Sequence, residues 1–160
     1  MNTAQKKLGQ RGFTLLLAAL VASVVLAMGA SIFKLAQKQI TLSSVARDSQ
    51  YAFYAADTGA ECALYWDLRF GYFATTAPDA IEAHCDGQFL NADGRAESYP
   101  QTMSFAYEPG GNCASVSVEK TIDPDNNAVR TVIHADGFNT RCVEVDTSPR
   151  ALQRSVELKY

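Results

Sequence analysis

Four cysteines are the residues whose type and spacing most clearly indicate chemistry. No two of them have the Cys-x-x-Cys spacing of a zinc site, and an even number favours disulfides wherever the chain lies outside the cytoplasm. Four cysteines allow three pairings, which sequence alone does not decide. Closure of the most local loops favours Cys62 with Cys85 and Cys113 with Cys142. Buried, unpaired thiols are the alternative.

The other polar residues offer little catalytic or metal-binding chemistry. His84 and His134 are single histidines outside any metal-ligand pattern, and no base or oxyanion cradle accompanies Ser43-Ser44. The run Asp123-x-Asp125-Asn126-Asn127 offers oxygen ligands for calcium, but it lacks the glycine and the distal glutamate of an EF-hand. Asp, Asn and Pro are also turn residues, which is the interpretation we favour. We expect no enzyme activity, no cofactor and no metal site.

An apolar stretch stands near the start of the chain. No residue from Phe13 to Phe33 is charged, and a helix of this length would span about 30 Å, the thickness of a bilayer's hydrocarbon core. Basic residues, which collect on the cytoplasmic side of a membrane, slightly favour a cytoplasmic N-terminus with the rest of the chain outside. They are Lys6, Lys7 and Arg11 before the stretch and Lys34 and Lys38 after it.

Two other interpretations of this N-terminus stay open. In a secretory signal peptide, residues 6–11 would be the basic region, Phe13–Leu26 the apolar region and Ala27-Met28-Gly29 the cleavage site. A plain single-pass anchor would not be cleaved at all. Neither interpretation uses the Gly-Phe-Thr sequence at the edge of the stretch.

That junction resembles the leader of type IV prepilins and of the pseudopilins of type II secretion. A basic leader ends in Gly12, and Phe13, Thr14 and three leucines follow. The resemblance implies that a prepilin peptidase cleaves between Gly12 and Phe13 and methylates the new amine. It also implies that the apolar helix stays in the lipid of the cytoplasmic membrane. From there it would pack against other pilin or pseudopilin subunits in an extracellular filament.

Two further regions resemble minor pilins, which accompany the pilus tip. The run from Ser49 to Asp67 contains an aromatic-Ala-Ala-acidic-x-Gly-x-Glu block, and residues 135–142 and 148–158 resemble closing strands. One position departs from the pilin pattern. Most pilins have a glutamate at the fifth residue after the cut, where this chain has Leu17. In the family this glutamate meets the N-terminal amine of a neighbour, so its absence resembles subunits that sit first, at the tip.

The distribution of charge argues against nucleic-acid binding. Residues 39–160 contain nine basic and all seventeen acidic side chains, a net charge of −8. Contacts with a phosphate backbone need clustered Lys and Arg. We therefore expect no nucleic-acid partner.

The helix is predicted to continue to about Leu68. Small residues recur at spacings of three, four or seven and form a narrow stripe, which we expect to pack on the protein's own sheet beyond Ala52. The aromatic residues of this region are expected to join that packing. The stripe, in which most residues are small, contains Leu35, Leu42, Val45, Ser49, Ala52, Ala56, Gly59 and Ala63, and the aromatic residues are Tyr51, Phe53, Tyr54, Tyr65 and Trp66.

The second half of the chain has a β pattern. From Gly71 to Ser98, turn residues predict a loop with at most a short helix near Pro78–His84. Alternation of apolar and polar residues then predicts four strands. They are Gln101–Tyr107, Cys113–Ile122, Ala128–Ala135 and Leu152–Tyr160.

Together these features predict an α+β, type IV pilin-like fold, with a long N-terminal helix on a small antiparallel sheet. The expected function is that of a minor pilin or pseudopilin precursor that primes, caps or joins a filament. The alternative is a membrane-anchored or secreted adhesion module. The segments are a leader (1–12), a transmembrane helix (13–34), its amphipathic continuation (35–69), a variable connection (70–99) and the sheet (100–160).

Overall fold

The computed structural model describes residues 9–76 and 82–160, with side chains from Phe13 onward. The chain divides into two compact units, residues 1–44 and 45–160, and each is described by itself. The helices and strands are α1 (Gly9–Phe70), β1 (His84–Cys85), β2 (Gln88–Phe89), β3 (Gln101–Tyr107), η1 (Pro109–Gly111), β4 (Ala114–Ile122), β5 (Val129–Phe138), η2 (Cys142–Glu144) and β6 (Gln153–Lys159).

The described residues of the first unit, 9–44, form the N-terminal part of α1. No proline interrupts residues 9–44, so every backbone amide beyond the first turn can bond within the helix. Every side chain from residue 13 to residue 44 is exposed, including the large apolar ones. The predicted apolar helix is therefore confirmed, and nothing within its own unit covers it.

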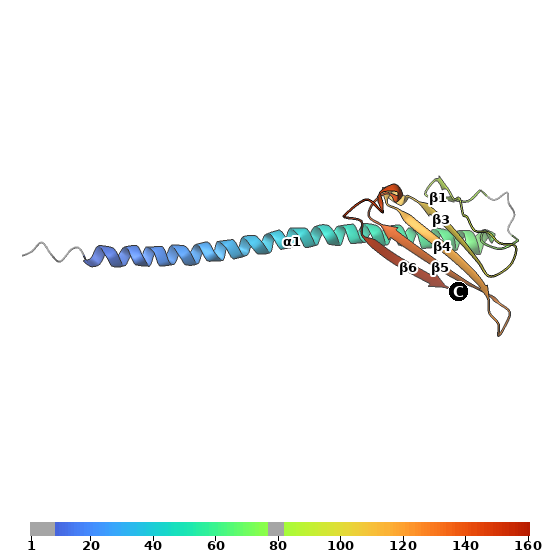
Figure 1. The fold of residues 1–160 in the computed structure, drawn as a ribbon, viewed down its shortest axis with the longest axis horizontal. Helices are drawn as coiled ribbons and strands as arrows, with labels where there is room; N and C mark the ends of the chain where they lie inside the picture. Colours follow the sequence, from blue (N-terminus) through green and yellow to red (C-terminus); the bar gives the residue numbers. More distant parts are fainter. Residues whose placement is uncertain (1–8, 77–81) are drawn as a thin grey trace, which may run out of the picture. The chain divides into compact units, whose positions relative to one another are not determined.

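The second unit is built on an antiparallel sheet in which each strand pairs with the next along the chain, in the order β3-β4-β5-β6 (Figure 1). Strict alternation of burial along β3 places every second side chain on the inner face. The register aligns Met103, Val118, Ile133 and Leu158 across all four strands. These side chains form one apolar row of the core.

The C-terminal part of α1, from Val45 onward, covers the inner face of this sheet (Figure 1). Ala52, Ala56 and Ala63 are completely buried there, as the stripe of small residues predicted. Gly137 of β5 lies so close to the helix that a Cβ on it would overlap the backbone carbonyl oxygen of Ala52 and the backbone nitrogen of Ala56. The contact is thus one of backbone against backbone.

The aromatic residues of the helix do not all join this packing, so that prediction was wrong for four of the five. Tyr51, Phe53, Tyr54 and Tyr65 are between 45% and 62% exposed. Only Trp66 is partly buried, and its Nε1 donates a hydrogen bond to the backbone oxygen of His84 at 3.0 Å. The close helix–sheet contact accepts only small side chains, which leaves the bulky ones on the other side of the helix.

The connection between α1 and β3 is more ordered than predicted. It contains the β1–β2 hairpin, with a turn at Asp86 and Gly87 where φ is positive. It also sends Phe73 and Leu90 into the core, where both are at most 2% exposed. Isolated apolar residues have no periodicity, so the pattern gave no sign of these contacts. Of the short helix expected near Pro78–His84, residues 77–81 lie outside the described part, and residues 82–84 are not helical.

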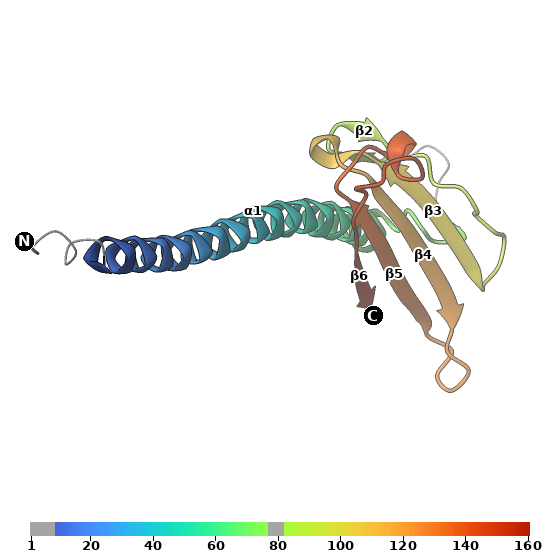
Figure 2. The same cartoon turned by 60° about the vertical axis from the view of Figure 1, so that its left-hand side comes forward.

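All four main strands are present, and their ends differ from the prediction by a few residues. The largest difference is β5, which continues to Phe138 rather than ending at Ala135. The turn between β4 and β5 extends beyond the neighbouring strand ends (Figure 2). In this turn Asp123 accepts hydrogen bonds from the backbone amide of Asp125 and from Arg130. Its carboxylate thus stabilises the turn, as the turn interpretation implies.

Replacing Gly137 with alanine should destabilise the second unit by about 3 kcal/mol, because its backbone neighbours cannot move aside as a side chain can. Gly59→Ala should cost less, since its Cβ would meet side-chain atoms and not backbone, the nearest being Cγ2 of Val116 at 2.9 Å. Gly29→Ala is the control, because nothing lies within 4 Å of that position. Denaturant unfolding of the full chain in detergent, followed by Trp66 fluorescence, measures all three. Equal stability of the Gly137 and Gly29 variants would contradict the packing described.

Candidate membrane segment and processing site

The N-terminal part of α1 has the properties of a membrane span. An 18-residue window within Phe13–Phe70 has a mean hydropathy of 2.5 and no buried residue, so the helix is long and apolar enough to cross a bilayer. Its large side chains face outward, with Leu16 65% and Leu26 73% exposed. A contiguous apolar surface of this kind indicates a lipid or protein partner rather than water.

The predicted cleavage position lies inside this helix. Gly12 and Phe13 both belong to α1, which begins at Gly9 in the described residues, and the Phe13 ring is 69% exposed. The basic residues Lys6 and Lys7 of the leader lie outside the described part of the chain. Leu17 is 54% exposed on the apolar surface. Cleavage between Gly12 and Phe13 stays a prediction.

Two disulfides join the four cysteines. Cys62 pairs with Cys85, tying α1 to β1, and Cys113 pairs with Cys142, tying the residue before β4 to η2. These are the pairs that local loop closure favours. The loops separate the bonded residues by 23 and 29 positions. Bonds that close loops of this size each stabilise a fold by about 3 kcal/mol, which matters for a unit with a small core.

A buried ionic network, absent from the sequence analysis, holds the end of α1 to the sheet. Asp67 and Lys120 are 8% and 7% exposed, and Lys120 Nζ lies 2.6 Å from Asp67 Oδ2. Lys120 Nζ also bonds Thr131 Oγ1 at 3.0 Å, and the hydroxyl of Tyr160 donates to Asp67 Oδ2 at 2.6 Å. Among the described residues, Asp67 Oδ1 has no hydrogen-bond partner. The sequence did carry a signal, since Asp67 follows Ala63 by four residues on the buried stripe, where a charge needs a partner.

Burial raises the pKa of two tyrosines, Tyr160 of this network and Tyr107 at the end of β3. Burial raises the pKa of Tyr160 well above its ordinary value of 10.0, and the hydrogen bond to Asp67 and that carboxylate's charge raise it further. Burial also raises the pKa of Tyr107 to about 12, with smaller contributions from Asp86 and Glu61. Both hydroxyls therefore stay protonated in the folded state at pH values where an unfolded tyrosine ionises.

Comparison with protein-family models, with curated proteins and with solved structures found no match to this chain. One long apolar N-terminal helix, whose C-terminal part packs on an antiparallel sheet, makes an α+β fold that fits the pilin-like arrangement.

Stability should fall as the pH rises above about 10, the pKa of an unfolded tyrosine, because the folded state then holds protons that the unfolded state has lost. Tyr160→Phe should lower the free energy of unfolding at pH 7 by about 1 kcal/mol, the net value of one hydrogen bond. The difference in free energy of unfolding between this variant and the parent should narrow above pH 10, since phenylalanine does not titrate. The measurement is urea unfolding from pH 7 to pH 11.

The matched control is Tyr54→Phe at an exposed tyrosine, 62% accessible, which should leave the free energy of unfolding at pH 7 unchanged. If the free energies of unfolding of Tyr160→Phe and of the parent differ by the same amount at all pH values, the Tyr160–Asp67 hydrogen bond does not couple proton binding to folding.

Proposed function

We propose that this chain is the precursor of a minor type IV pilin or pseudopilin subunit. In this proposal the basic leader holds the N-terminus in the cytoplasm, the apolar helix crosses the cytoplasmic membrane, and residues 45–160 lie outside. A prepilin peptidase removes residues 1–12, and the mature subunit primes, caps or joins an extracellular filament.

The observation that carries the proposal is the complete exposure of the apolar helix directly after the Gly12–Phe13 junction. A signal peptide needs an apolar region of only about 7–15 residues. Here the uncharged stretch continues to Phe33 in an unbroken helix. That helix joins the folded second unit directly, because α1 ends only at Phe70.

The composition of the segment suits transfer from lipid into a bundle of helices. Lipid tails are as apolar as leucine, so helices in a membrane associate through close packing and not through the hydrophobic effect. Ala19, Ser23, Ala27 and Ser31 recur at every fourth position and would let a neighbouring helix approach. The Ser23 and Ser31 hydroxyls donate to backbone oxygens of their own helix, at 2.8 and 2.9 Å. They therefore require no partner from outside.

The disulfides agree with export of the second unit. They persist in oxidising compartments outside the cytoplasm. Among the described residues every cysteine is paired. The topology with residues 45–160 outside meets this requirement, whereas the reverse topology does not.

The test is the intact mass and N-terminal residue of the protein extracted from membranes of the cells that produce it. We expect a chain that starts at Phe13 with one additional methyl group on its amine. A start at Ala30 would instead indicate signal peptidase, and an unprocessed Met1 would indicate a plain anchor. Either result would refute the proposal.

Two glycine variants make this test sharper. Gly12→Leu alters the residue before the proposed cut and should leave the leader attached. Gly29→Leu alters the small residue at the end of the competing Ala27-Met28-Gly29 site and should still give a start at Phe13. The opposite pattern would identify the chain as a secreted protein with an ordinary signal peptide.

A further inference from the structure

One side of the second unit's helix carries charge and apolar surface that the sheet does not cover. Asp57, Glu61 and Tyr65 follow one another at intervals of four residues, so they line one side of α1, which we call the acidic face. Glu61 and Tyr65 are exposed and line a shallow surface groove, and Asp57 is partly exposed. Within residues 9–76 and 82–160, neither carboxylate forms an ion pair.

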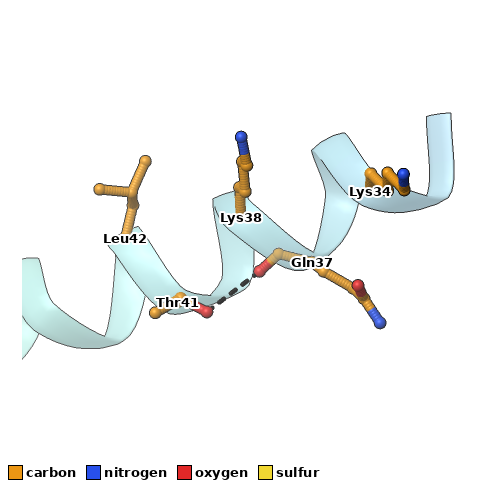
Figure 3. Close-up of a pocket in the computed structure, with 5 residues that line it drawn as sticks. All are labelled: Lys34, Gln37, Lys38, Thr41 and Leu42. Carbon is orange, nitrogen blue, oxygen red and sulfur yellow. Dashed lines mark hydrogen bonds between the residues drawn. The ribbon is translucent and has the colours of Figure 1, made fainter. Parts of the chain in front are cut away.

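The first unit has a matching surface of opposite charge. Lys34, Lys38 and Leu42 also stand at intervals of four residues and are exposed, and we call them the basic face. Figure 3 shows Lys38 and Leu42 pointing to the same side of the helix. In the described part of the chain, neither lysine has an acidic partner within salt-bridge distance.

The two faces correspond residue by residue. Each residue of the acidic face follows its counterpart in the basic face by 23 positions: Asp57 follows Lys34, Glu61 follows Lys38, and Tyr65 follows Leu42. Two parallel helices displaced by this amount would therefore align both opposite charges and both apolar residues at once. An antiparallel pair could also align both charges, Lys34 with Glu61 and Lys38 with Asp57. It would require the two N-termini to point in opposite directions, which two copies with the proposed topology in one membrane do not allow.

Other parallel displacements satisfy the charges less well. A displacement of 10 residues also aligns two pairs of opposite charges, Lys38 with Asp48 and Arg47 with Asp57. A displacement of 14 residues aligns Lys34 with Asp48 and Arg47 with Glu61. At each displacement the two pairs lie far from each other along the helix, 9 residues in the first case and 13 in the second. At about 100° per residue, this puts the two pairs on widely different sides of the helix. Displacements one turn shorter or longer than 23 keep only one charge pair. Of these displacements, only 23 puts two pairs on one face.

We propose that the basic face of one copy of this chain packs on the acidic face of a second, parallel copy, with the helices displaced by 23 residues. The inference rests on the proposed function and narrows it to a subunit that is present in at least two adjacent copies. Exposed ion pairs contribute little to affinity but do fix register. The contact is head-to-tail, because different surfaces of the two copies meet, and such contacts propagate into open assemblies.

The size of the displacement also determines at which stage of assembly the contact can form. Twenty-three residues of helix correspond to about 35 Å, more than the thickness of a bilayer core. Two copies at the same depth in the membrane therefore cannot align these faces. The pairing becomes possible once one copy has moved outward, which is the movement that filament assembly requires.

The test places a photo-activated cross-linking amino acid at Leu42 in cells that export the full chain. We expect an adduct of two copies, with the cross-link in the tryptic peptide that ends at Arg69. Reversing one face, with Lys34→Glu and Lys38→Glu or with Asp57→Lys and Glu61→Lys, should lower the yield about tenfold, because like charges then oppose each other. Reversing both faces in one chain should restore the yield.

The control reverses two exposed basic residues that belong to neither face, Arg47→Glu with Arg150→Glu, and should leave the yield unchanged. Restoration by the double reversal cannot come from a chain that merely misfolds. A yield unaffected by either single reversal, no recovery in the double reversal, or an adduct only with a different protein would each overturn the inference.

The result is distinguishable from that of the N-terminal analysis. A chain that starts at a methylated Phe13 but gives no adduct between copies would overturn this contact and leave the proposed function standing. A chain that keeps Met1 yet forms the adduct would refute the proposed function and support the contact.

Discussion

The close approach of α1 to strand β5 is the constraint on which the second unit depends. Gly137 leaves no room for a Cβ beside the backbone of Ala52 and Ala56, so the helix lies on the sheet at the shortest distance that its own backbone allows. Only small side chains fit this contact. The same constraint explains the other side of the helix, because the bulky residues excluded from the contact, such as Tyr54 and Tyr65, become its exposed surface.

A contact made of alanine and glycine buries little apolar area, and other interactions supplement it. The Asp67–Lys120 pair and the hydroxyl of Tyr160 join the end of the helix to β4 and to the residue that follows β6. Removing one member of such a buried pair is far more costly than the pair is stabilising, because the other charge would remain buried alone. The network therefore specifies the position of the helix more than it adds net stability, and the disulfides supply stability at the edges.

The two units expose apolar surface for different reasons. In residues 13–33 the whole circumference of the helix is apolar, which suits lipid or a bundle of similar helices. Beyond Val45 one side is already covered by the sheet, and the exposed side mixes aromatic rings with carboxylates. Such a mixed surface suits a partner with both apolar and basic groups. The basic face of a second copy has both.

The sequence by itself determined the apolar helix, its continuation along a stripe of small residues and the four alternating strands, and it favoured the more local pairing of the cysteines without deciding it. These features are periodic or local, so they can be recognised without knowing what lies across the interface. Only the tertiary structure decided that four of the five aromatic residues of the helix face outward, that Phe73 and Leu90 enter the core, and that Lys120 and Tyr160 are the partners of Asp67. Those outcomes depend on which residues meet across the helix–sheet contact. The two partners of Asp67 lie 53 and 93 positions from it along the chain, and no local sequence pattern indicates contacts between such distant residues.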